Sequence, residues 1–501
     1  ALANQDYSFA LGKEAAANTQ LTTSIGSKTN ATGFSAIAIG SGHVPPGNTV
    51  IENIQGAQAT ADDSMAVGAS ALANQAGATA LGKLSKATNK NAVAVGPDSK
   101  ASGSWATATG ASANASGEAS AAFGESATAS GKTSIATGSH ASASGENAIA
   151  SGKSAIANKN GATAVGANTE ASGDKATALG DLAKAKNNRA TALGHDSQAT
   201  GAFSTAAGVS SRASGVASVA TGKDAKALAD NTIAIGAGAN ATSNAAGSLV
   251  IGRGAVVNAT DATVVGPVAQ ANGANATAVG RGAAANGIES TALGRGSLAN
   301  GNQSTALGKG SQAKVDSGVA LGDGAVADRV ARKGSEIVIN NSKPSASTGF
   351  NDQDAATSNS VYAPVRLVDA PGALQLIKNT VKGNKGAVSV GDSGNTRQII
   401  NVAPGSADSD AVNVAQLKAV AGGIKKYSVT SPDNSITIPP PATGNDPQNF
   451  KIKMNTTAVQ NAAAWNIKSG SERGNGEQVR GGQTVTFAGS DIINVVRNGK
   501  T

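Results

Sequence analysis

The sequence lacks the residues on which most reactive and metal-binding sites depend. It contains no cysteine among 501 residues, and its three histidines, His43, His140 and His195, lie far apart. The absence of cysteine excludes disulfides, thiolate metal ligands and cysteine nucleophiles. The acidic residues are scattered and show no clustering of the kind that a catalytic groove needs. We therefore expect a non-catalytic protein with no metal and no cofactor.

Aromatic side chains are also scarce. Two Trp, three Tyr and seven Phe make up 2% of the chain, whereas such side chains normally fill the cores of large domains. The hydrophobic content of 40% is mostly alanine, which buries little area. A large rounded core is therefore excluded, and only thin layers of structure remain.

Long apolar runs are absent as well. No stretch approaches about 18 consecutive apolar residues, so the sequence predicts no membrane-spanning helix, and no signal peptide stands at its start. The net charge of +8 is spread thinly, and we expect no nucleic-acid partner. The chain starts at Ala1 and stops at Thr501, and we interpret it as a fragment of a longer protein.

What the sequence does contain is a glycine that recurs every fourteen residues, preceded by Ala and an aliphatic residue, as in Ala80-Leu81-Gly82. We call it the repeat glycine. It occurs in 22 copies: at positions 12, 26 and 40, at every fourteenth position from 68 to 236, and, after one step of 16, from 252 to 322. Chance does not produce such a register, so the chain is a repeat protein.

Residues alternate in size within each copy. In Thr291-Ala292-Leu293 the two larger side chains flank alanine, and a period of two predicts a β-strand. A second short stretch, such as Ser297-Leu298-Ala299, follows the repeat glycine, and another glycine often stands seven residues after the first. Each copy therefore predicts strand, turn, strand, turn. Stacked copies predict an all-β fold, a parallel β-solenoid in which one repeat forms one coil.

Two irregularities interrupt the period. Residues 41–63, which contain Pro45 and Pro46, predict a loop insertion at the surface. The two additional residues before Gly252 predict a local bulge.

A single coil holds little apolar area, because it contains one Leu, Ile or Val, often a Thr, and a few Ala. That area does not offset the backbone entropy lost by fourteen ordered residues. Alanine and serine on both faces of many strands suit the close approach of neighbouring chains. The sequence therefore predicts an oligomer.

The segment Ser35-Ala36-Ile37-Ala38-Ile39-Gly40 resembles the head repeat of the YadA-like trimeric autotransporter adhesins of Gram-negative bacteria. Residues 397–403 (Arg-Gln-Ile-Ile-Asn-Val-Ala) and 410–417 (Asp-Ala-Val-Asn-Val-Ala-Gln-Leu) are similar to that family's neck, which joins head to stalk. Val388-Ser389-Val390-Gly391, just before the neck, resembles a last head coil. The block between this coil and the regular repeats would then be an insertion.

The resemblance implies a left-handed parallel β-roll, a parallel homotrimer, and a neck that clamps the three chains. Six neck residues are expected to contact neighbouring chains: Ile399, Val402, Val412, Asn413, Gln416 and Leu417. Val412 and Leu417 belong to a short apolar stripe. Asn413 and Gln416 set the register or bind a neighbour, as polar residues at coiled-coil seams do, or they are polar residues that face solvent.

The last eighty residues differ from the repeats. Ser435–Ile438, Phe450–Lys453 and Thr484–Phe487 alternate as strands do and flank turns rich in Pro and Gly. Trp465 resembles the tryptophan of the family's Trp-ring or GIN stalk domains, or it is a core residue of a small β-domain. We therefore divide the chain into a β-roll head (1–324, with the insertion 41–63), a head insertion (325–386), a last coil with the neck (387–421), and a β-rich stalk domain (422–501).

The family resemblance implies a cell-surface adhesin, held at the outer membrane of a Gram-negative bacterium by an anchor expected downstream of Thr501. It would attach multivalently to extracellular matrix, host cells, other bacteria or abiotic surfaces. The alternative is an ice- or mineral-binding solenoid that uses threonines three residues before the repeat glycine, such as Thr177. We expect these threonines to pack inward, which argues against the alternative.

Overall fold

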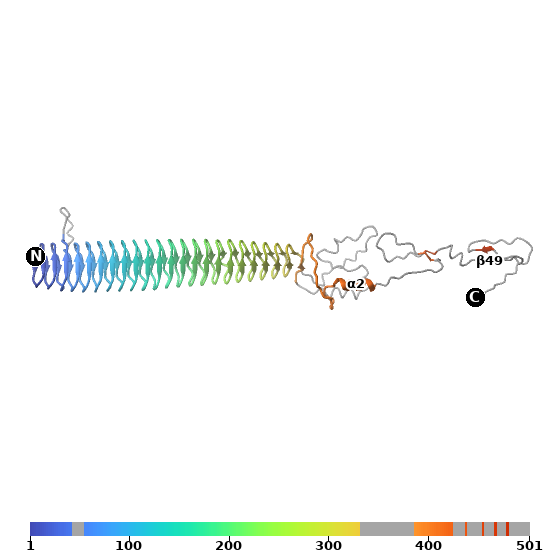
Figure 1. Cartoon of the computed structure of the whole chain (residues 1–501), viewed down its shortest axis with the longest axis horizontal. Coiled ribbons are helices and arrows are strands. Elements are labelled where there is room, and N and C mark those ends of the chain that lie inside the picture. Colours follow the sequence, from blue (N-terminus) through green and yellow to red (C-terminus); the bar gives the residue numbers. More distant parts are fainter. Residues whose placement is uncertain are drawn as a thin grey trace, which may run out of the picture. The chain divides into compact units, whose positions relative to one another are not determined.

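A computed structural model of the chain describes residues 1–42, 55–330 and 385–423, together with four short strands further along. It divides into two compact units, Ala1–Ile400 and Asn401–Thr501. The first unit is a parallel β-solenoid, seen as the stacked coils in Figure 1. The predicted fold class is therefore confirmed for the head, while the left-handed sense of the coil stays a prediction.

Each coil contributes one strand to each of two parallel ladders of 23 strands. The odd ladder runs from β1 (Leu2–Ala3) to β45 (Val326–Ala327), in strands of two residues. The even ladder runs from β2 (Phe9–Leu11) to β44 (Val319–Leu321), in strands of three residues, and ends with β46 (Val388–Ser389). Partners lie one repeat apart, as Thr177↔Thr191 shows for β24 (Thr177–Leu179) and β26 (Thr191–Leu193). At about 4.8 Å per coil, 22 coils extend for roughly 100 Å.

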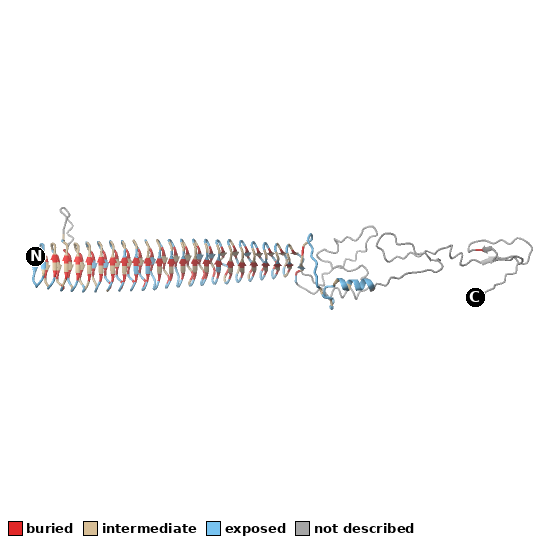
Figure 2. Cartoon of the chain, viewed as in Figure 1, coloured by how far each residue is buried: buried red, intermediate tan, exposed pale blue. Residues whose placement is uncertain are grey.

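The interior of the solenoid is made of alanine. The middle residue of each even strand and the second residue of each odd strand point inward, and Ala178 and Ala185 are fully buried. Figure 2 shows these buried positions repeating along the strands. The prediction that the threonines three residues before the repeat glycine pack inward is wrong. Thr177 and its counterparts are half-buried on the outward side, because the coil is too thin to enclose anything much larger than alanine.

Serine and threonine replace alanine at some inward positions, and most of their hydroxyl groups have a partner, whereas those of Ser290 and Ser304 have none among the described residues. The Ser85 hydroxyl donates to the carbonyl of Gly82 (2.8 Å), and the Ser120 hydroxyl donates to that of Gly117 (2.7 Å). A buried hydroxyl costs little when it has a partner within the same turn. Small polar and small apolar residues are therefore interchangeable inside the coil.

The two irregularities fall in turns rather than in strands. The Ala57 amide donates to the Gly40 carbonyl (3.1 Å), as the Ala71 amide does to that of Gly68, and β7 (Gln58–Ala59) continues the odd ladder. The insertion therefore ends before Ala57 and is shorter than the predicted segment 41–63. The two additional residues before Gly252 widen the turn between β33 (Asn240–Ala241) and β34 (Leu249–Ile251), so the bulge lies outside the ladders.

The largest fully buried apolar side chains of the described chain lie just after the widened turn, in two successive coils: Val250, Val257 and Val264. They occupy inward positions that are alanine in most other coils. Each valine places two additional methyl groups in the interior of the solenoid.

Replacing Val264 by alanine is expected to lower the local free energy of unfolding by about 2 kcal/mol, because it removes two buried methyl groups and leaves a cavity. Amide hydrogen exchange of residues 249–266 would measure the loss. The matched control is Val268→Ala at an exposed turn position. Equal protection from amide exchange in both variants would contradict a stabilising role of the buried valines.

The C-terminal end of the solenoid is closed by a segment distant in sequence. β46 pairs in parallel with β44, with Val319↔Val388 and Ala320↔Ser389. The Arg397 guanidinium donates to the carbonyls of Val390 and Asp323.

Residues 325–327 belong to the solenoid, so the insertion predicted at 325–386 starts later, and residues 331–384 lie outside the described part.

Candidate functional site

The outward side of the even ladder is uncharged from end to end. The two outward residues of each strand from β2 to β44 are aliphatic, Thr, Ala, Ser, Phe or Met, with no Asp, Glu, Lys or Arg. We call this surface the apolar stripe. Its leucines remain substantially exposed in the single chain, with exposed fractions of 38% for Leu179, 42% for Leu293 and 45% for Leu321. Continuous apolar surface of this extent marks an interaction site.

The outward side of the odd ladder is mixed: most of its residues are polar or charged, but apolar residues such as Leu72, Ile156 and Leu298 also occur. We call it the polar face, defined by the first residue of each odd strand. Lys86 and Lys100 lie directly opposite each other on β11 (Lys86–Ala87) and β13 (Lys100–Ala101), and Arg212 lies opposite Lys226. The expectation of small residues on both strand faces is therefore wrong, because alanine and serine are concentrated on the inward side.

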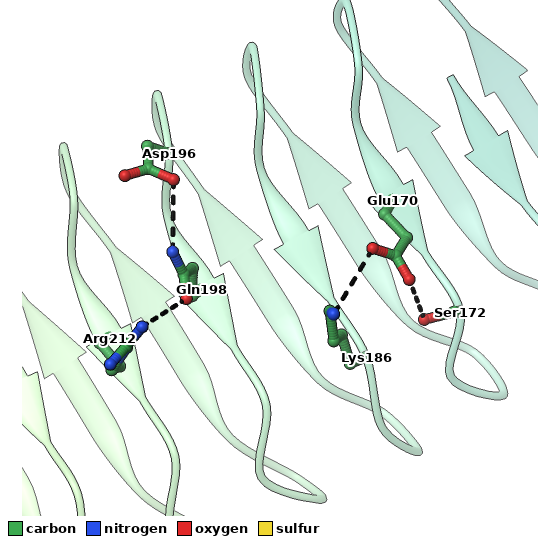
Figure 3. Close-up of polar contacts among 6 residues, drawn as sticks. All are labelled: Glu170, Ser172, Lys186, Asp196, Gln198 and Arg212. Atoms are coloured by element: carbon green, nitrogen blue, oxygen red, sulfur yellow. Dashed lines mark hydrogen bonds and ion pairs between the residues drawn. The ribbon is translucent and has the colours of Figure 1, made fainter. Parts of the chain in front are cut away.

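Polar side chains on this face connect neighbouring coils. Figure 3 shows Glu170 accepting a hydrogen bond from the Ser172 hydroxyl (3.0 Å) while its other carboxylate oxygen lies 3.7 Å from the Lys186 ammonium. Arg212 donates to Gln198 (2.9 Å), whose amide donates to Asp196 (3.3 Å). Exposed pairs of this kind contribute little stability each. They leave charged and amide groups accessible along the face.

Four asparagines form a ladder beside the polar face. Asn258 donates to Asn272 (2.7 Å), Asn272 to Asn286 (2.6 Å), and Asn286 to Asn300 (2.7 Å). All four stand one position after an odd strand and are exposed. Such amide ladders arise when identical residues stack at the spacing of parallel strands.

The neck from Asn401 onward belongs to the second unit and contains α2 (Val414–Gly423). Asn413 caps this helix: its side-chain oxygen accepts from the Gln416 amide (3.0 Å), and the Gln416 side-chain oxygen accepts from the Asn413 amide (3.2 Å). This is a capping box in which each residue satisfies the other's free amide. Gln416 also exchanges two hydrogen bonds of 3.0 Å with the Gly405 backbone, and Asn413 donates to the Val402 carbonyl.

Asn413 and Gln416 therefore make these hydrogen bonds within one chain, and their contact with a neighbouring chain stays a prediction. The Asn-x-x-Gln spacing ahead of an apolar segment is the signal that could have revealed the capping box. By contrast, Ile399, Val412 and Leu417 are 69%, 70% and 63% exposed, and Val402 is half-buried. A helix of ten residues with exposed apolar side chains is marginal on its own.

Asn413→Ala is expected to destabilise α2 by about 1 kcal/mol, because the first turn of the helix loses its cap. Faster amide exchange across residues 414–423 would show this. Lys418→Ala, at an exposed position of the same helix, should leave the exchange rates unchanged. A variant with unchanged exchange would argue against the capping role.

A turn before α2 depends on pH. Backbone amides of Ser406 and Ala407 donate to the Asp410 carboxylate and lower the pKa of this group from its ordinary value of 3.8. Because the folded pKa is below the unfolded one, the stabilisation is present above about pH 4 and is lost as pH falls through the lowered pKa. We expect the Ser406 amide resonance to report this transition, and Asp410→Asn to abolish it.

Two antiparallel pairs are described further along. β47 (Ile436–Thr437) pairs with β48 (Lys453–Met454), and β49 (Trp465–Ile467) pairs with β50 (Glu477–Val479), with Trp465 opposite Val479. The surroundings of the Trp465 side chain and the predicted strand 484–487 lie outside the described residues. The role of Trp465 as a core residue stays a prediction.

The parts of the chain that the structure describes contain no helix long and apolar enough to cross a bilayer. Within the same parts, no group of three or more His, Asp or Glu side chains converges.

Two family models match the chain. The YadA head domain repeat matches within residues 59–325, and the coiled stalk of trimeric autotransporter adhesin matches residues 398–438. The head matches cover 59–85, 87–113, 115–141, 143–169, 171–197, 185–211, 199–225, 213–239, 258–283, 285–311 and 299–325. The chain belongs to the YadA-like trimeric autotransporter adhesins.

Named relatives of this adhesin are much longer than the chain. The autotransporter adhesin BadA of Bartonella henselae is 42% identical over 93 residues, which are 18% of this chain and 2% of that protein. The trimeric autotransporter adhesin AtaA of Acinetobacter sp. (strain Tol 5) is 46% identical over 78 residues, which are 15% of this chain and 2% of that protein. The chain therefore spans a small part of the curated relatives it matches.

A solved structure of the collagen-binding domain of the Yersinia adhesin YadA also matches this adhesin. The two are 24% identical, and the match covers 42% of this chain and 86% of that chain, with a TM-score of 0.29.

Proposed function

We propose that three parallel copies of the chain pack through their apolar stripes into the head of a cell-surface adhesin. The observation that carries the proposal is the contrast between a partly exposed even ladder with no charged outward residue and an odd ladder whose outward residues are mostly polar, with charged ones between Lys86 and Lys226. Packing three stripes around one axis buries the apolar surface and leaves the polar faces outward. Membership of a trimeric family supports three copies rather than two.

The exposed apolar residues of the neck support the same assembly. We infer that Ile399, Val402, Val412 and Leu417 contact the neighbouring chains, while Asn413 and Gln416 prepare the helix for that contact within each chain. A marginal helix becomes stable when its apolar side chains are covered by tertiary or quaternary packing.

The outer surface of this assembly would act by multivalent attachment. Its polar faces and turns repeat along the solenoid, so many weak contacts to matrix proteins, host cells, other bacteria or abiotic surfaces would combine through a high effective concentration. As in its family, the protein would stand at the outer membrane of a Gram-negative bacterium. Binding would be spread along the surface rather than confined to one pocket.

The test measures whether cells that display the full-length protein are retained on collagen, fibronectin, cultured cells, other bacteria or plastic. We expect retention on at least one of these surfaces. We also expect this retention to be lost when substitutions in the apolar stripe prevent assembly without changing the polar face. Equal retention with and without the displayed protein on all of these surfaces would contradict the proposal.

The outward threonines keep the ice- or mineral-binding alternative open. Thr163, Thr177, Thr191 and Thr205 form one continuous column on the even ladder. The neighbouring column, however, carries residues such as Val165, Leu179 and Leu193, which favour protein packing over the regular hydroxyl array that a crystal lattice requires. A thermal-hysteresis measurement separates the two functions.

A further inference from the structure

The two edges of each coil carry charges of opposite sign in the C-terminal third of the solenoid. We call the turn that starts at the repeat glycine the glycine edge, and the turn after the odd strand, seven to nine residues later, the distal edge. In the coils that start at Gly252, Gly266, Gly280, Gly294 and Gly308, the glycine edge has only basic residues among its charged positions, and the distal edge so defined has only acidic ones. Lys314, the residue between β43 (Gln312–Ala313) and this edge, is basic and exposed. The basic residues of the glycine edge are Arg253, Arg281, Arg295 and Lys309, and the acidic residues of the distal edge are Asp261, Glu289 and Asp316.

All seven side chains are exposed. Within the described residues, Lys309 alone among them has an ion pair, with Asp323 at 3.9 Å. Glu289 accepts a hydrogen bond from Gln303 (3.0 Å), and Asp316 accepts one from the Asn302 amide (2.8 Å). The two rows therefore do not neutralise each other within one chain, because they lie on opposite edges of the same coils.

We propose that the glycine edge of each chain meets the distal edge of the next chain at the same height, so that Arg253 faces Asp261, Arg281 faces Glu289 and Lys309 faces Asp316 across the interface. This inference rests on the proposed parallel assembly through the apolar stripe. Its partner is a second copy of this chain.

The geometry of a cyclic assembly leads to this pairing. Rotation about an axis parallel to the solenoid keeps every coil at its own height and brings unlike edges together, which is the heterologous contact that closes into a ring. An antiparallel, face-to-face pair would instead bring like edges together. The glycine edge is positively charged and the distal edge negatively charged. The parallel arrangement therefore places opposite charges side by side, whereas the antiparallel arrangement places like charges side by side.

The pairing therefore selects the direction and the vertical register of the chains. The apolar stripe is similar in every coil, so a slip by one coil would still bury apolar surface. The charged edges change from coil to coil: the coil at Gly266 has no charge at either edge, while its neighbours do. Charge pairs of this kind contribute to specificity more than to affinity.

Earlier coils with a charge at both edges do not follow one rule. Glu125 stands across from Lys132, and Asp181 from Arg189, with the signs reversed relative to the C-terminal coils. Lys83 and Lys90 have the same sign, as do Lys153 and Lys159, and the coil at Gly222 has both signs at its glycine edge. Lys132 and Asp181 also have partners in their own chain, Glu118 (3.1 Å) and His195 (3.7 Å). The inference is therefore confined to the coils from Gly252 to Ser317.

Site-specific cross-linking tests the pairing directly, because the chain contains no cysteine. The full chain with both Arg281→Cys and Glu289→Cys would be treated with a short bismaleimide. We expect covalent trimers on a denaturing gel, since each chain then links to both neighbours. The single variants Arg281→Cys and Glu289→Cys are the matched controls and should stay unlinked. Linked dimers from either single variant would indicate that like edges meet and would overturn the proposal.

Sedimentation of the same samples separates the two proposals. A trimer in solution without cross-edge links would overturn the edge pairing and leave the proposed adhesin assembly standing. A monomer would overturn both.

Charge exchange provides a second test. Arg281→Glu and Glu289→Arg are each expected to lower the melting temperature of the oligomer at low salt, and the combined exchange to restore it. Gln270→Glu, on the polar face, is the control for added charge. Failure of the combined exchange to restore the melting temperature would contradict the pairing.

Discussion

Gly294→Ala should disrupt the solenoid at its own coil. Gly294 has a φ of +136°, a backbone conformation that is open to glycine and very costly for other residues. A Cβ placed there would lie 2.5 Å from the carbonyl oxygen of Gly308 in the next coil. Because that neighbour is backbone, relief requires the two coils to move apart. We expect a local loss of at least 3 kcal/mol, the sum of backbone strain and steric overlap.

Gly296, two residues away in the same turn, is the matched control. Its φ is +64°, and a Cβ there would have no heavy atom within 4 Å. Asparagine is tolerated in this left-handed conformation, so Gly296→Asn should be close to neutral. Hydrogen exchange and limited proteolysis around residues 291–310 would compare the two variants. Similar protection in both would show that the repeat glycine is dispensable.

The double variant Leu293→Lys and Leu307→Lys is expected to abolish the trimer. The two leucines are 42% and 39% exposed on adjacent strands of the apolar stripe, β40 (Thr291–Leu293) and β42 (Thr305–Leu307). In the proposed assembly each substitution places three ammonium groups, one from each chain, in an apolar interface without partners. Burial of unpaired charges costs several kcal/mol each, which exceeds what two coils contribute.

Sedimentation velocity of this variant should show monomers. Gln270→Lys with Gln312→Lys adds the same charge on the polar face and should leave the trimer intact. An intact trimer in the stripe variant would mean that the chains assemble through another surface.

The sequence was sufficient to predict the solenoid but not to decide which side of each strand faces inward. The period of fourteen and the alternation around Ala292 require stacked strands, and both are observed. Alternation shows that the two faces differ, yet either face can be the inner one. The usual rule that larger residues are buried suggested the wrong choice for Thr291 and its counterparts, because the inward positions of the coil are mostly alanine and other small residues.

The turns and the neck could be predicted only in part. Two turn positions in each coil adopt a positive φ, and residues other than glycine often occupy them. Examples are Trp105 at +57° and Phe203 at +59°. No local propensity favours bulky residues in that conformation, so stacking on neighbouring coils must impose it. For the neck, the exposed Val412 and Leu417 followed from the family resemblance, whereas the capping box of Asn413 and Gln416 appeared only in the structure.

Hydrogen bonds between successive coils run along the length of the solenoid, as from the Gly308 amide to the Leu293 carbonyl at 2.9 Å. A pull along this direction is carried by all coil boundaries in series, so the weakest boundary yields first and the coils separate one after another. Each coil that peels away would release up to about 46–50 Å of extended backbone from its fourteen residues. A bacterium held by such a tether in flowing liquid would thus experience a series of small yields, which dissipate work and delay the rupture of its attachment.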